Sequence, residues 1–446
     1  MKLTWIKPED MIGHELRQLR EEGHDVGDLA GRWESAVAQA TELSSLRPLA
    51  EELMAQAARI GAAGQGDELE PSELEAIQAL RPPQPDLSAS PVDMEDRLLG
   101  AWQGRAAGCL LGKPVEKIPR AGIRAILQAT DNWPLRDWFT AEGLPSDVAA
   151  RYPWNIASRP TSLRENIVCM PEDDDLNYTM LNLYVLETYG PGFTTDNVAE
   201  QWLKLMPVLT VFTAERIAYL NLLNFLEAPA TATYRNPYRE WIGAQIRADI
   251  FGYVNPGRPA EAAAMAWRDA RLSHVKNGIY GEMFAAALVA GAFVTADPKR
   301  LVEIGLSQIP TTSRLAEAVR FAASLPATEP TWEGALDRLY ERYGHYHWVH
   351  AINNAAMVAA ALVYGEGDFE QSICLAVMGG WDTDCNGATV GSVMGAALGA
   401  RRLPQRWITP MVDRVRSSLK GFDNSSFGDL TDRTLAVLRR LEEGAR

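Results

Sequence analysis

The sequence predicts an all-α protein with one compact multi-helix domain and an N-terminal helical extension. Through most of the chain, apolar residues recur at steps of three and four, which is the period of a helix. We find no segment that alternates apolar and polar residues convincingly over the length of a strand. The chain has 446 residues, more than a single core usually holds, so one large domain with an extension is the simplest division.

Residues 1–80 are predicted to form the extension, because they are rich in Leu, Ala, Glu and Arg and have a helical period. Helices are expected there at residues 9–22, 28–41 and 46–60. This part has no cluster of His, Cys or Asp that suggests chemistry, so we interpret it as a cap or interaction module. Residues 81–92 hold four prolines and are interpreted as a linker. The main domain is then expected to span residues 93–446.

Within that domain, proline and glycine separate one predicted helix from the next. After a first helix that begins at Asp93 and a second that follows residue 175, helices are expected at residues 195–205, 214–227, 237–250, 259–271, 278–293, 314–323, 332–342, 352–364, 369–378, 404–418 and 429–443. Residues 131–171 hold many Trp, Pro and Arg without a clear period. We expect a long irregular loop there, of the kind that often covers a site.

Composition excludes some classes of partner. The formal net charge of −15 argues against bulk binding of nucleic acid or of an anionic membrane, both of which require a basic surface. The four cysteines lie far apart without a CxxC pair, as expected for reduced thiols of a cytoplasmic protein. The N-terminus has no apolar stretch of signal-peptide length, and the longest weakly polar run, residues 284–296, is too short to span a bilayer.

Two runs of glycine at four-residue spacing predict a close packing of helices. The first comprises Gly100, Gly104, Gly108 and Gly112, and the second comprises Gly387, Gly391, Gly395 and Gly399. Each glycine within a helix costs about 1 kcal/mol relative to alanine, so four cost about 4 kcal/mol. Close approach of another backbone would offset this cost, and each run is the obvious partner of the other. Pro114 is expected to end the first helix, and Glu116 follows in the loop.

The second glycine run follows a pair of aspartates. Gly379 and Gly380 lead, through Trp381, into Asp382 and Asp384. Carboxylates two residues apart point about 200° away from each other on a helix, so these two must lie in a turn or at a helix start. Because an aspartate pair is costly to bury in an apolar stretch unless a cation or hydrogen-bond donors meet it, we expect a metal site here.

A second acidic run precedes a predicted helix near residue 176. One aspartate there would be explained as a helix N-cap, where carboxylates are favoured. The run holds four successive acids, Glu172, Asp173, Asp174 and Asp175. Four successive carboxylates repel one another unless a cation is present. Both acidic runs therefore indicate a metal role.

Aromatic and histidine residues leave alternatives open. In residues 236–257, Tyr238 and Trp241 could stack on a base, but an aromatic stripe at helical spacing more often belongs to a core. His274 is as consistent with a helix C-cap as with a ligand. His345, His347 and His350 are expected to be loop or packing residues, because no third and fourth zinc ligand lie nearby in sequence.

The two acidic runs and the two glycine runs, in this order, resemble the ADP-ribosylglycohydrolase family over about residues 93–441. The resemblance implies an all-α fold with two magnesium or manganese ions between its helices. It implies metal ligands at Asp173, Asp174, Asp175, Asp382, Asp384 and Cys385. This chain departs from the family pattern in three places, with Trp381 inserted after the glycines, Cys385 replacing a hydroxyl residue and Asp173 replacing threonine.

The same resemblance implies hydrolysis of an N- or O-glycosidic ADP-ribosyl bond in a small molecule or a modified protein. Glu116, Asp174 and Asp384 are the expected catalytic residues, with Glu116 either transferring a proton or shielding the metal until substrate arrives. The candidate substrate-binding residues are Gly379, Gly380, Asn386, Tyr238 and Trp241. Alternatives are hydrolysis of a smaller ribosyl glycoside or nucleoside derivative, a non-catalytic ADP-ribose-binding protein and, less favoured, a two-metal phosphohydrolase.

Overall fold

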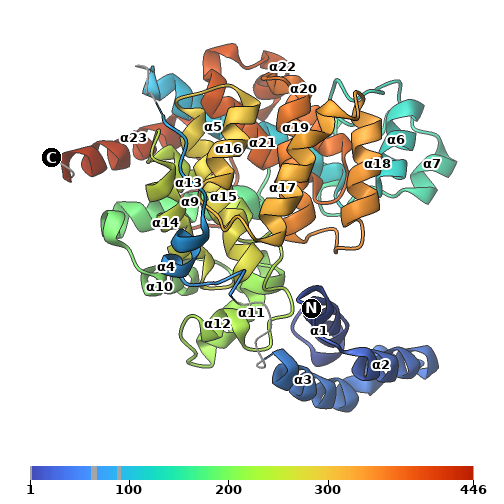
Figure 1. The fold of residues 1–446 in the computed structure, drawn as a ribbon. Helices are drawn as coiled ribbons and strands as arrows, with labels where there is room; N and C mark the ends of the chain where they lie inside the picture. Colours follow the sequence, from blue (N-terminus) through green and yellow to red (C-terminus); the bar gives the residue numbers. More distant parts are fainter. Residues whose placement is uncertain (1–2, 62–67, 88–91, 445–446) are drawn as a thin grey trace.

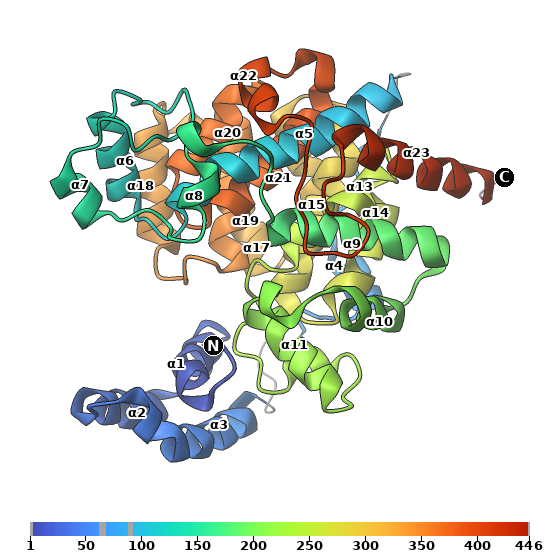
Figure 2. The same ribbon diagram turned by 180° about the vertical axis from the view of Figure 1, so that it is seen from behind.

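The predicted all-α class is confirmed. A computed structural model describes residues 3–61, 68–87 and 92–444, and in these ranges the regular structure consists of α-helices and short 3₁₀ turns. The only β pairing within them consists of isolated bridges, such as the one between Met170 and Val415. The helices form one large body, from which the C-terminal helix projects on one side and the first three helices on another (Figures 1 and 2).

The helices run in sequence from α1 to α23. The N-terminal ones are α1 (Pro8–Glu21), α2 (Gly27–Gln39), α3 (Arg47–Gly61) and α4 (Leu74–Leu80). Those of the first half of the body are α5 (Met94–Gly112), α6 (Arg120–Ala129), α7 (Ser146–Arg151), α8 (Arg159–Ser162), α9 (Asp174–Tyr189), α10 (Thr195–Leu205), α11 (Thr213–Leu223), α12 (Ala230–Thr233) and α13 (Asp249–Tyr253). The rest are α14 (Pro259–Ala270), α15 (Lys276–Ala292), α16 (Pro298–Leu306), α17 (Arg314–Ser324), α18 (Trp332–Tyr343), α19 (Ala351–Tyr364), α20 (Phe369–Met378), α21 (Thr383–Leu398), α22 (Gln405–Ile408) and α23 (Phe427–Gly444).

Two predicted helices are wrong. Residues 237–250 hold turns and the 3₁₀ segment Gln245–Arg247 instead, because their backbone pairs with the loop before α19, where the amide of Ile242 donates to Val349 at 2.8 Å. Residues 404–418 are helical only in short pieces. Val412 and Asp413 there have positive φ angles of 51° and 46°, which a right-handed helix cannot accommodate.

Two other predictions differ in extent. The helix expected at 214–227 ends at Leu223. Helices α4, α6, α12 and α16 were not predicted. The loop expected at 131–171 is largely irregular and includes the short helices α7 and α8. The remaining helices agree with the sequence prediction to within about two residues at most ends, which is the usual uncertainty of helix boundaries.

The two glycine runs pack against each other, as predicted. A Cβ atom on Gly108 would collide with the carbonyl of Gly387, and one on Gly104 would collide with that of Gly391. A Cβ on Gly100 would lie 2.6 Å from the carbonyl oxygen of Gly395. The order of these pairs shows that α5 and α21 run antiparallel. The close contact brings the C-terminal end of α5 to the N-terminal end of α21.

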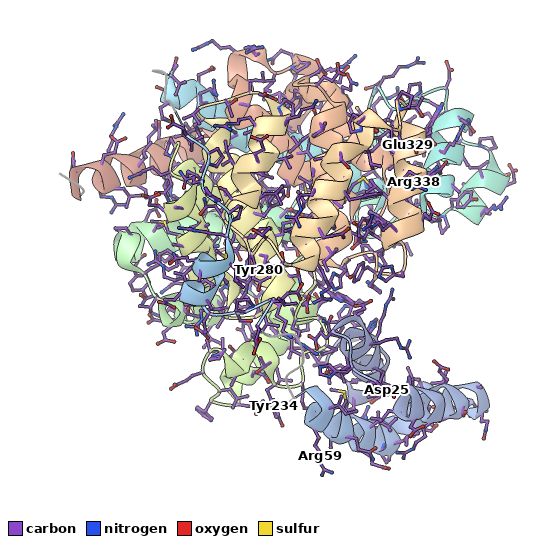
Figure 3. The ribbon with its side chains drawn as sticks, in the orientation of Figure 1. Asp25, Arg59, Tyr234, Tyr280, Glu329 and Arg338 are labelled. Carbon is purple, nitrogen blue, oxygen red and sulfur yellow. The ribbon has the colours of Figure 1, made fainter. Side chains whose placement is uncertain are left out.

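Residues 3–61, which we call the N-terminal module, have a core of their own. Helices α1 to α3 bury residues such as Ile12 and Leu53, and this core also takes in Tyr238 and Trp241 from the body. The segment after the module belongs to the body, since Ile77 of α4 lies in the main core. Tyr280 of α15 donates its hydroxyl to the carbonyl of Pro71 just before α4 (Figure 3).

Buried ion pairs join the N-terminal module to the body. Arg239 contacts Glu15 at 2.9 Å and Glu22 at 2.8 Å, and its side chain is only 10% exposed. The amide of Gln18 donates to Glu240 at 3.1 Å. Removing one partner of a buried pair is strongly destabilising, so these contacts fix the orientation of the module. The division into an extension, a linker and a domain remains a prediction, and residues 88–91 of the expected linker lie outside the described ranges.

None of the helices in the described ranges is long and apolar enough to cross a membrane. The four cysteines are all buried and free.

Candidate active site

Three helix ends meet at the candidate site. The hydroxyl of Thr383, at the start of α21, donates to the carbonyl of Gly112, the last residue of α5, at 2.9 Å. Arg105 of α5 donates to the carbonyl of Asp175 at 2.7 Å, which holds the first turn of α9 against α5. The two acidic runs, about 200 residues apart in sequence, are therefore placed at one end of the glycine-packed helix pair.

The aspartate pair lies at a turn, as expected. Gly380 and Trp381 have φ angles of 79° and 56°, and α21 begins two residues after Trp381. A bulky residue seldom adopts a positive φ, so other contacts must hold Trp381 in place. Its ring stacks on that of Tyr340 with centroids 4.5 Å apart. Trp381 thus anchors the turn that presents Asp382.

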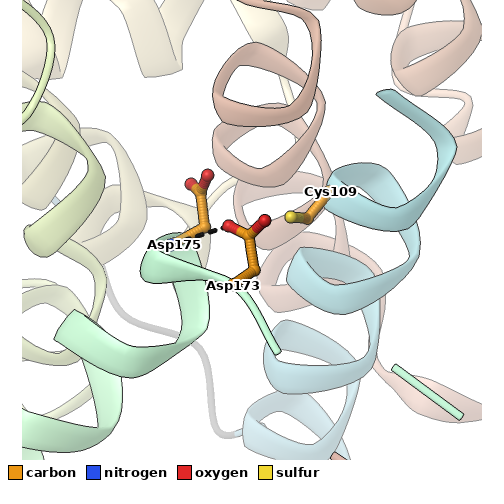
Figure 4. A group of neighbouring side chains, drawn as sticks. All are labelled: Cys109, Asp173 and Asp175. Atoms are coloured by element: carbon orange, nitrogen blue, oxygen red, sulfur yellow. Dashed lines mark hydrogen bonds between the residues drawn. The ribbon is translucent and has the colours of Figure 1, made fainter. Parts of the chain in front are cut away.

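The first acidic group contains Asp173, Asp175 and Cys109, whose ligand atoms lie within 4.8 Å of one another. Figure 4 shows the sulfur of Cys109 pointing toward the carboxyl of Asp173, with the carboxyl of Asp175 nearby. Asp173 is the N-cap of α9 and accepts the amide of Asp175 at 2.9 Å. It also forms a buried ion pair with Lys113. Asp175 forms an ion pair with Arg105 at 3.1 Å through one oxygen. Among the described residues, its other oxygen, Oδ2, has no hydrogen-bond partner although it is buried.

The second acidic group contains Asp382, Asp384 and Cys385. One ligand atom of each lies within 4.8 Å of the others. Asp384 is 7% exposed, and its Oδ1 atom is buried without a hydrogen-bond partner in the described part of the chain. Asn354 accepts the amide of Asp382 at 3.2 Å and the side-chain amide of Asn386 at 2.8 Å. Asn386 therefore supports the turn through Asn354.

Burial and mutual repulsion act on the protonation of these carboxyls. Burial, reinforced by neighbouring carboxylates, raises the pKa of Asp174, Asp175 and Asp382 well above the usual value. The same causes raise the pKa of Asp384. Burial would raise the pKa of Asp173, but the ammonium group of Lys113 and the hydrogen bonds from Lys113, the Asp175 amide and the Cys109 thiol together lower it. The cluster thus lacks positive charge, apart from that of Lys113 and Arg105.

The donor set fits oxygen-preferring divalent cations. The two groups hold four aspartates, and Asp174 lies between Asp173 and Asp175 in the first acidic run. The nearby cations are the buried Lys113, the buried Arg105, which also pairs with Asp249 at 2.7 Å, and the more distant Lys117. The orphaned oxygens of Asp175 and Asp384 are of the type that Mg²⁺ and Mn²⁺ prefer. Burial raises the pKa of the Cys109 and Cys385 thiols, so both sulfurs are protonated without a metal and are poor ligands for these ions.

Glu116 is held beside the acidic groups by two donors. Its Oε2 atom accepts the amide of Asn155 at 2.5 Å, and its Oε1 atom lies 3.1 Å from the ammonium of Lys117. Burial and the nearby carboxylate of Asp384 raise the pKa of Glu116 to about 7. This carboxyl can therefore carry or release a proton near neutral pH.

A cavity of about 580 Å³ opens over the acidic residues, within the range of small-molecule sites. Its lining includes Glu116, Asp173, Asp174, Asp382, Asp384 and Cys385. Trp241 also lines the cavity, whereas Tyr238 is fully buried in the core of the N-terminal module. Gly379, Gly380 and Asn386 are not among the lining residues of the described chain; a Cβ on Gly380 would meet the hydroxyl of Tyr340.

The histidines pack outside the two acidic groups. His347 stacks on Trp241 with ring centroids 4.3 Å apart. His350 caps α19 by accepting the amide of Ile352 at 3.2 Å. His274 is buried and bonds the hydroxyl of Ser273 at 2.8 Å. These contacts confirm loop and packing roles for His347 and His350.

Several residues of the site were not singled out from the sequence. They are Arg105 and Lys113, which neutralise aspartates, Asn155, which holds Glu116, and Glu215, which lines the cavity. Lys113 offered a signal, because it lies three residues before Glu116 at the end of the glycine helix. The contact of Asn155 with Glu116 depends on the path of an irregular loop, which the sequence pattern does not predict.

Comparisons with known proteins identify the class. The ADP-ribosylglycohydrolase family model matches residues 90–442, and the chain belongs to this family of glycohydrolases. The fold is similar to that of a solved structure described as an ADP-ribosylglycohydrolase-related protein complex. The two are 21% identical, with a TM-score of 0.45, over 78% of this chain and 99% of that one. No curated protein matches the sequence.

Proposed function

We propose that this protein is a metal-dependent glycohydrolase that cleaves an N- or O-glycosidic ADP-ribosyl bond. The observation that carries the proposal is the meeting of two acidic runs, distant in sequence, in one cavity beside a carboxyl whose pKa is raised to about 7. Membership of the glycohydrolase family supports the reaction type. The substrate would be a small molecule or a protein that carries ADP-ribose.

Two magnesium or manganese ions are the proposed cofactor. Asp174, Asp175, Asp382 and Asp384 would hold them, with Asp173 as a further ligand. When bound, such ions would supply positive charge that orients ribose hydroxyls and a water molecule and stabilises negative charge. Lys113 limits the part that Asp173 can play, because it already pairs with that carboxylate.

Glu116 is the proposed proton donor and acceptor. Cleavage at the anomeric carbon passes through an oxocarbenium-like state, and the leaving group departs more readily when it receives a proton. Asn155 and Lys117 hold the two oxygens of Glu116, so the carboxyl is oriented before substrate binds. Trp241, which lines the same cavity, is the proposed contact for an aromatic part of the substrate. Gly379, Gly380 and Asn386 would act indirectly, by shaping the turn before Asp382.

Release of ADP-ribose from ADP-ribosyl-arginine, followed by mass spectrometry with manganese and with EDTA, tests this proposal. We expect turnover only with manganese, and its loss in Asp384→Ala and Asp174→Ala. Asp432→Ala, an exposed position on α23, should keep full activity. Full activity of the wild type in EDTA would refute the metal requirement. Cleavage of a nucleoside but not of ADP-ribosyl-arginine would assign the smaller-substrate alternative.

A further inference from the structure

The cavity includes residues from outside the region that the family model matches. That match begins at residue 90. Thr4 and Trp5 of the N-terminal module nevertheless line the same cavity as Asp174, Asp384 and Glu116. The module was expected to have no catalytic part, yet it forms part of the wall around the acidic residues.

Trp5 is held in an unusual conformation. Its φ angle is 73°, a region that bulky residues rarely enter and that persists only when surrounding contacts impose it. Arg216 of α11 donates to the carbonyl of the preceding Thr4 at 3.1 Å. The Trp5 ring meets Tyr238 at 5.7 Å and Trp241 at 6.2 Å between centroids, both edge to face. Backbone and ring are thus both fixed by the body.

The position of Trp5 also follows from the docking of the whole module. Arg239 of the body pairs with Glu15, which lies in α1, and with Glu22, the residue directly after α1. Helix α1 begins three residues after Trp5, so these ion pairs also limit where Trp5 can lie. Trp5 remains half-buried despite these contacts. A large indole that is fixed in place and borders a cavity leaves apolar surface exposed there, which a planar apolar ligand would cover.

Two further tryptophans face the same cavity. Trp241 and Trp348 line it together with Trp5. Trp348 is half-buried, whereas Trp241 is only 3% exposed and has one face covered by His347. Lys117, which pairs with Glu116, lies 5.7 Å from the centre of the Trp348 ring. The cavity therefore combines carboxylates, suited to cations and ribose hydroxyls, with aromatic rings, suited to a planar heterocycle.

We propose that the N-terminal module completes the substrate site, and that Trp5 and Trp348 bind a planar heterocycle of the substrate, with the buried Trp241 supporting the ring of Trp5. The inference rests on the proposed function for the presence of ribose in the substrate. What it adds is the part of the protein that binds the planar heterocycle of that substrate. It assigns to residues outside the family region a direct part in substrate selection.

Calorimetric titration of the full-length protein tests this inference. The probes are ADP-ribose and adenosine, which carry a heterocycle, and ribose 5-phosphate, which does not. Loss of a base–aromatic stack should weaken binding of both ring-bearing probes about 5- to 100-fold in Trp5→Ala. Trp5→Phe, which keeps a ring, should restore most of the affinity. Ribose 5-phosphate should bind alike to all three proteins.

The matched control is Trp267→Ala. Trp267 is a half-buried indole on α14 that donates to the carbonyl of Ser72 at 2.8 Å. It is not among the described residues that line the cavity. It should bind the three probes as the wild type does. Thermal unfolding of the wild type and of each variant establishes whether the substitutions leave the protein folded. If Trp5→Ala melts at a lower temperature and loses affinity for all three probes alike, including ribose 5-phosphate, the direct contact is refuted.

The outcomes separate this inference from the proposed function. Equal binding of ADP-ribose by the wild type and by Trp5→Ala overturns the inference, while hydrolysis can still stand. Binding of adenosine that depends on Trp5, without release of ADP-ribose from either an N- or an O-glycosidic substrate, upholds the inference and refutes the function. A wild type that binds neither ring-bearing probe refutes both.

Discussion

At the scale of single residues, the chemistry of the site depends on which carboxyls carry protons and which face a cation. Lys113 and Arg105 already neutralise Asp173 and one oxygen of Asp175. The remaining carboxylates have raised pKa values because they are buried together. A divalent cation would replace the protons that these groups otherwise retain.

Glu116→Gln should separate proton transfer from metal binding. The amide keeps the size of the side chain but cannot donate or accept the catalytic proton. We expect kcat to fall about 10²- to 10⁴-fold, the usual contribution of a general acid or base, with the manganese affinity unchanged. Steady-state kinetics and a manganese titration on the same preparation measure both. A large loss of manganese affinity would instead indicate that Glu116 is a metal ligand that shields the site.

Cys385→Ser should preserve activity. Burial and the adjacent carboxylates keep the Cys385 thiol protonated, so it is not suited to bind magnesium or manganese as a thiolate. A serine hydroxyl is a harder donor than a thiol and suits these ions better. We expect kcat/KM with manganese to stay within about threefold of the wild-type value. A threefold change corresponds to about 0.6 kcal/mol in the activation free energy. Loss of activity together with loss of metal would show that the sulfur is a ligand.

At the scale of helices, the site exists because α5 and α21 approach each other more closely than side chains would allow. Gly108 and Gly387 each lie against the other's carbonyl. This contact determines where Asp382 and Asp384 lie relative to the end of α5. The precision of the site therefore depends on packing some distance from it.

Substitution of a packed glycine by alanine tests this dependence. Alanine is the better helix former by about 1 kcal/mol, so Gly31→Ala on the exposed face of α2, where a Cβ meets nothing within 4 Å, should be neutral or stabilising. Gly108→Ala would place its Cβ against a backbone carbonyl that cannot move aside. We expect it to destabilise the protein by about 3 kcal/mol or more, as for severe overpacking. Urea unfolding of both variants measures the difference, and equal stability would contradict the packing account.

The elements that the sequence predicted well are those whose evidence is local. Glycine spacing predicted the α5–α21 contact, and the acidic runs predicted their own place at helix starts. Residues 237–250 were predicted as a helix because their aromatic spacing is helical, but pairing with the loop before α19 determines their structure. Partners that lie far away in sequence, such as Lys113 for Asp173 or Thr4 for the cavity, leave no periodic signal.

At the scale of the whole molecule, the N-terminal module is part of the structure that surrounds the cavity. His14 of α1 contacts His347 of the body at 5.4 Å between ring centroids. Burial lowers the pKa of His14 to about 4 and that of His347 to about 3. Both imidazoles are therefore neutral in the folded protein at pH 5, where the unfolded chain would carry the charges.

The module interface should weaken on acidification. The folded pKa values lie below the unfolded value of 6.5, so between pH 6.5 and about 4 the unfolded chain binds more protons. The stability is present above pH 6.5 and is lost as the pH falls. After allowance for partial exposure, we expect a loss on the order of 1 kcal/mol per histidine between pH 7 and pH 5.

Urea unfolding of the wild type and of His14→Phe at the two pH values measures this loss. The phenylalanine keeps an aromatic ring against the body but cannot be protonated. The variant should lose less stability than the wild type on acidification. An equal loss in both proteins would show that His14 is not responsible.

The proposed function requires that the two acidic runs form one divalent-cation site on which hydrolysis depends. The most direct measurement is titration of the metal-free protein with manganese, with bound metal and product release followed on the same samples. We predict saturation near two ions per chain, activity that rises with occupancy, and loss of both in Asp384→Asn and Asp174→Asn. Full activity of the metal-free protein, or no saturable manganese binding by the wild type, would contradict the account.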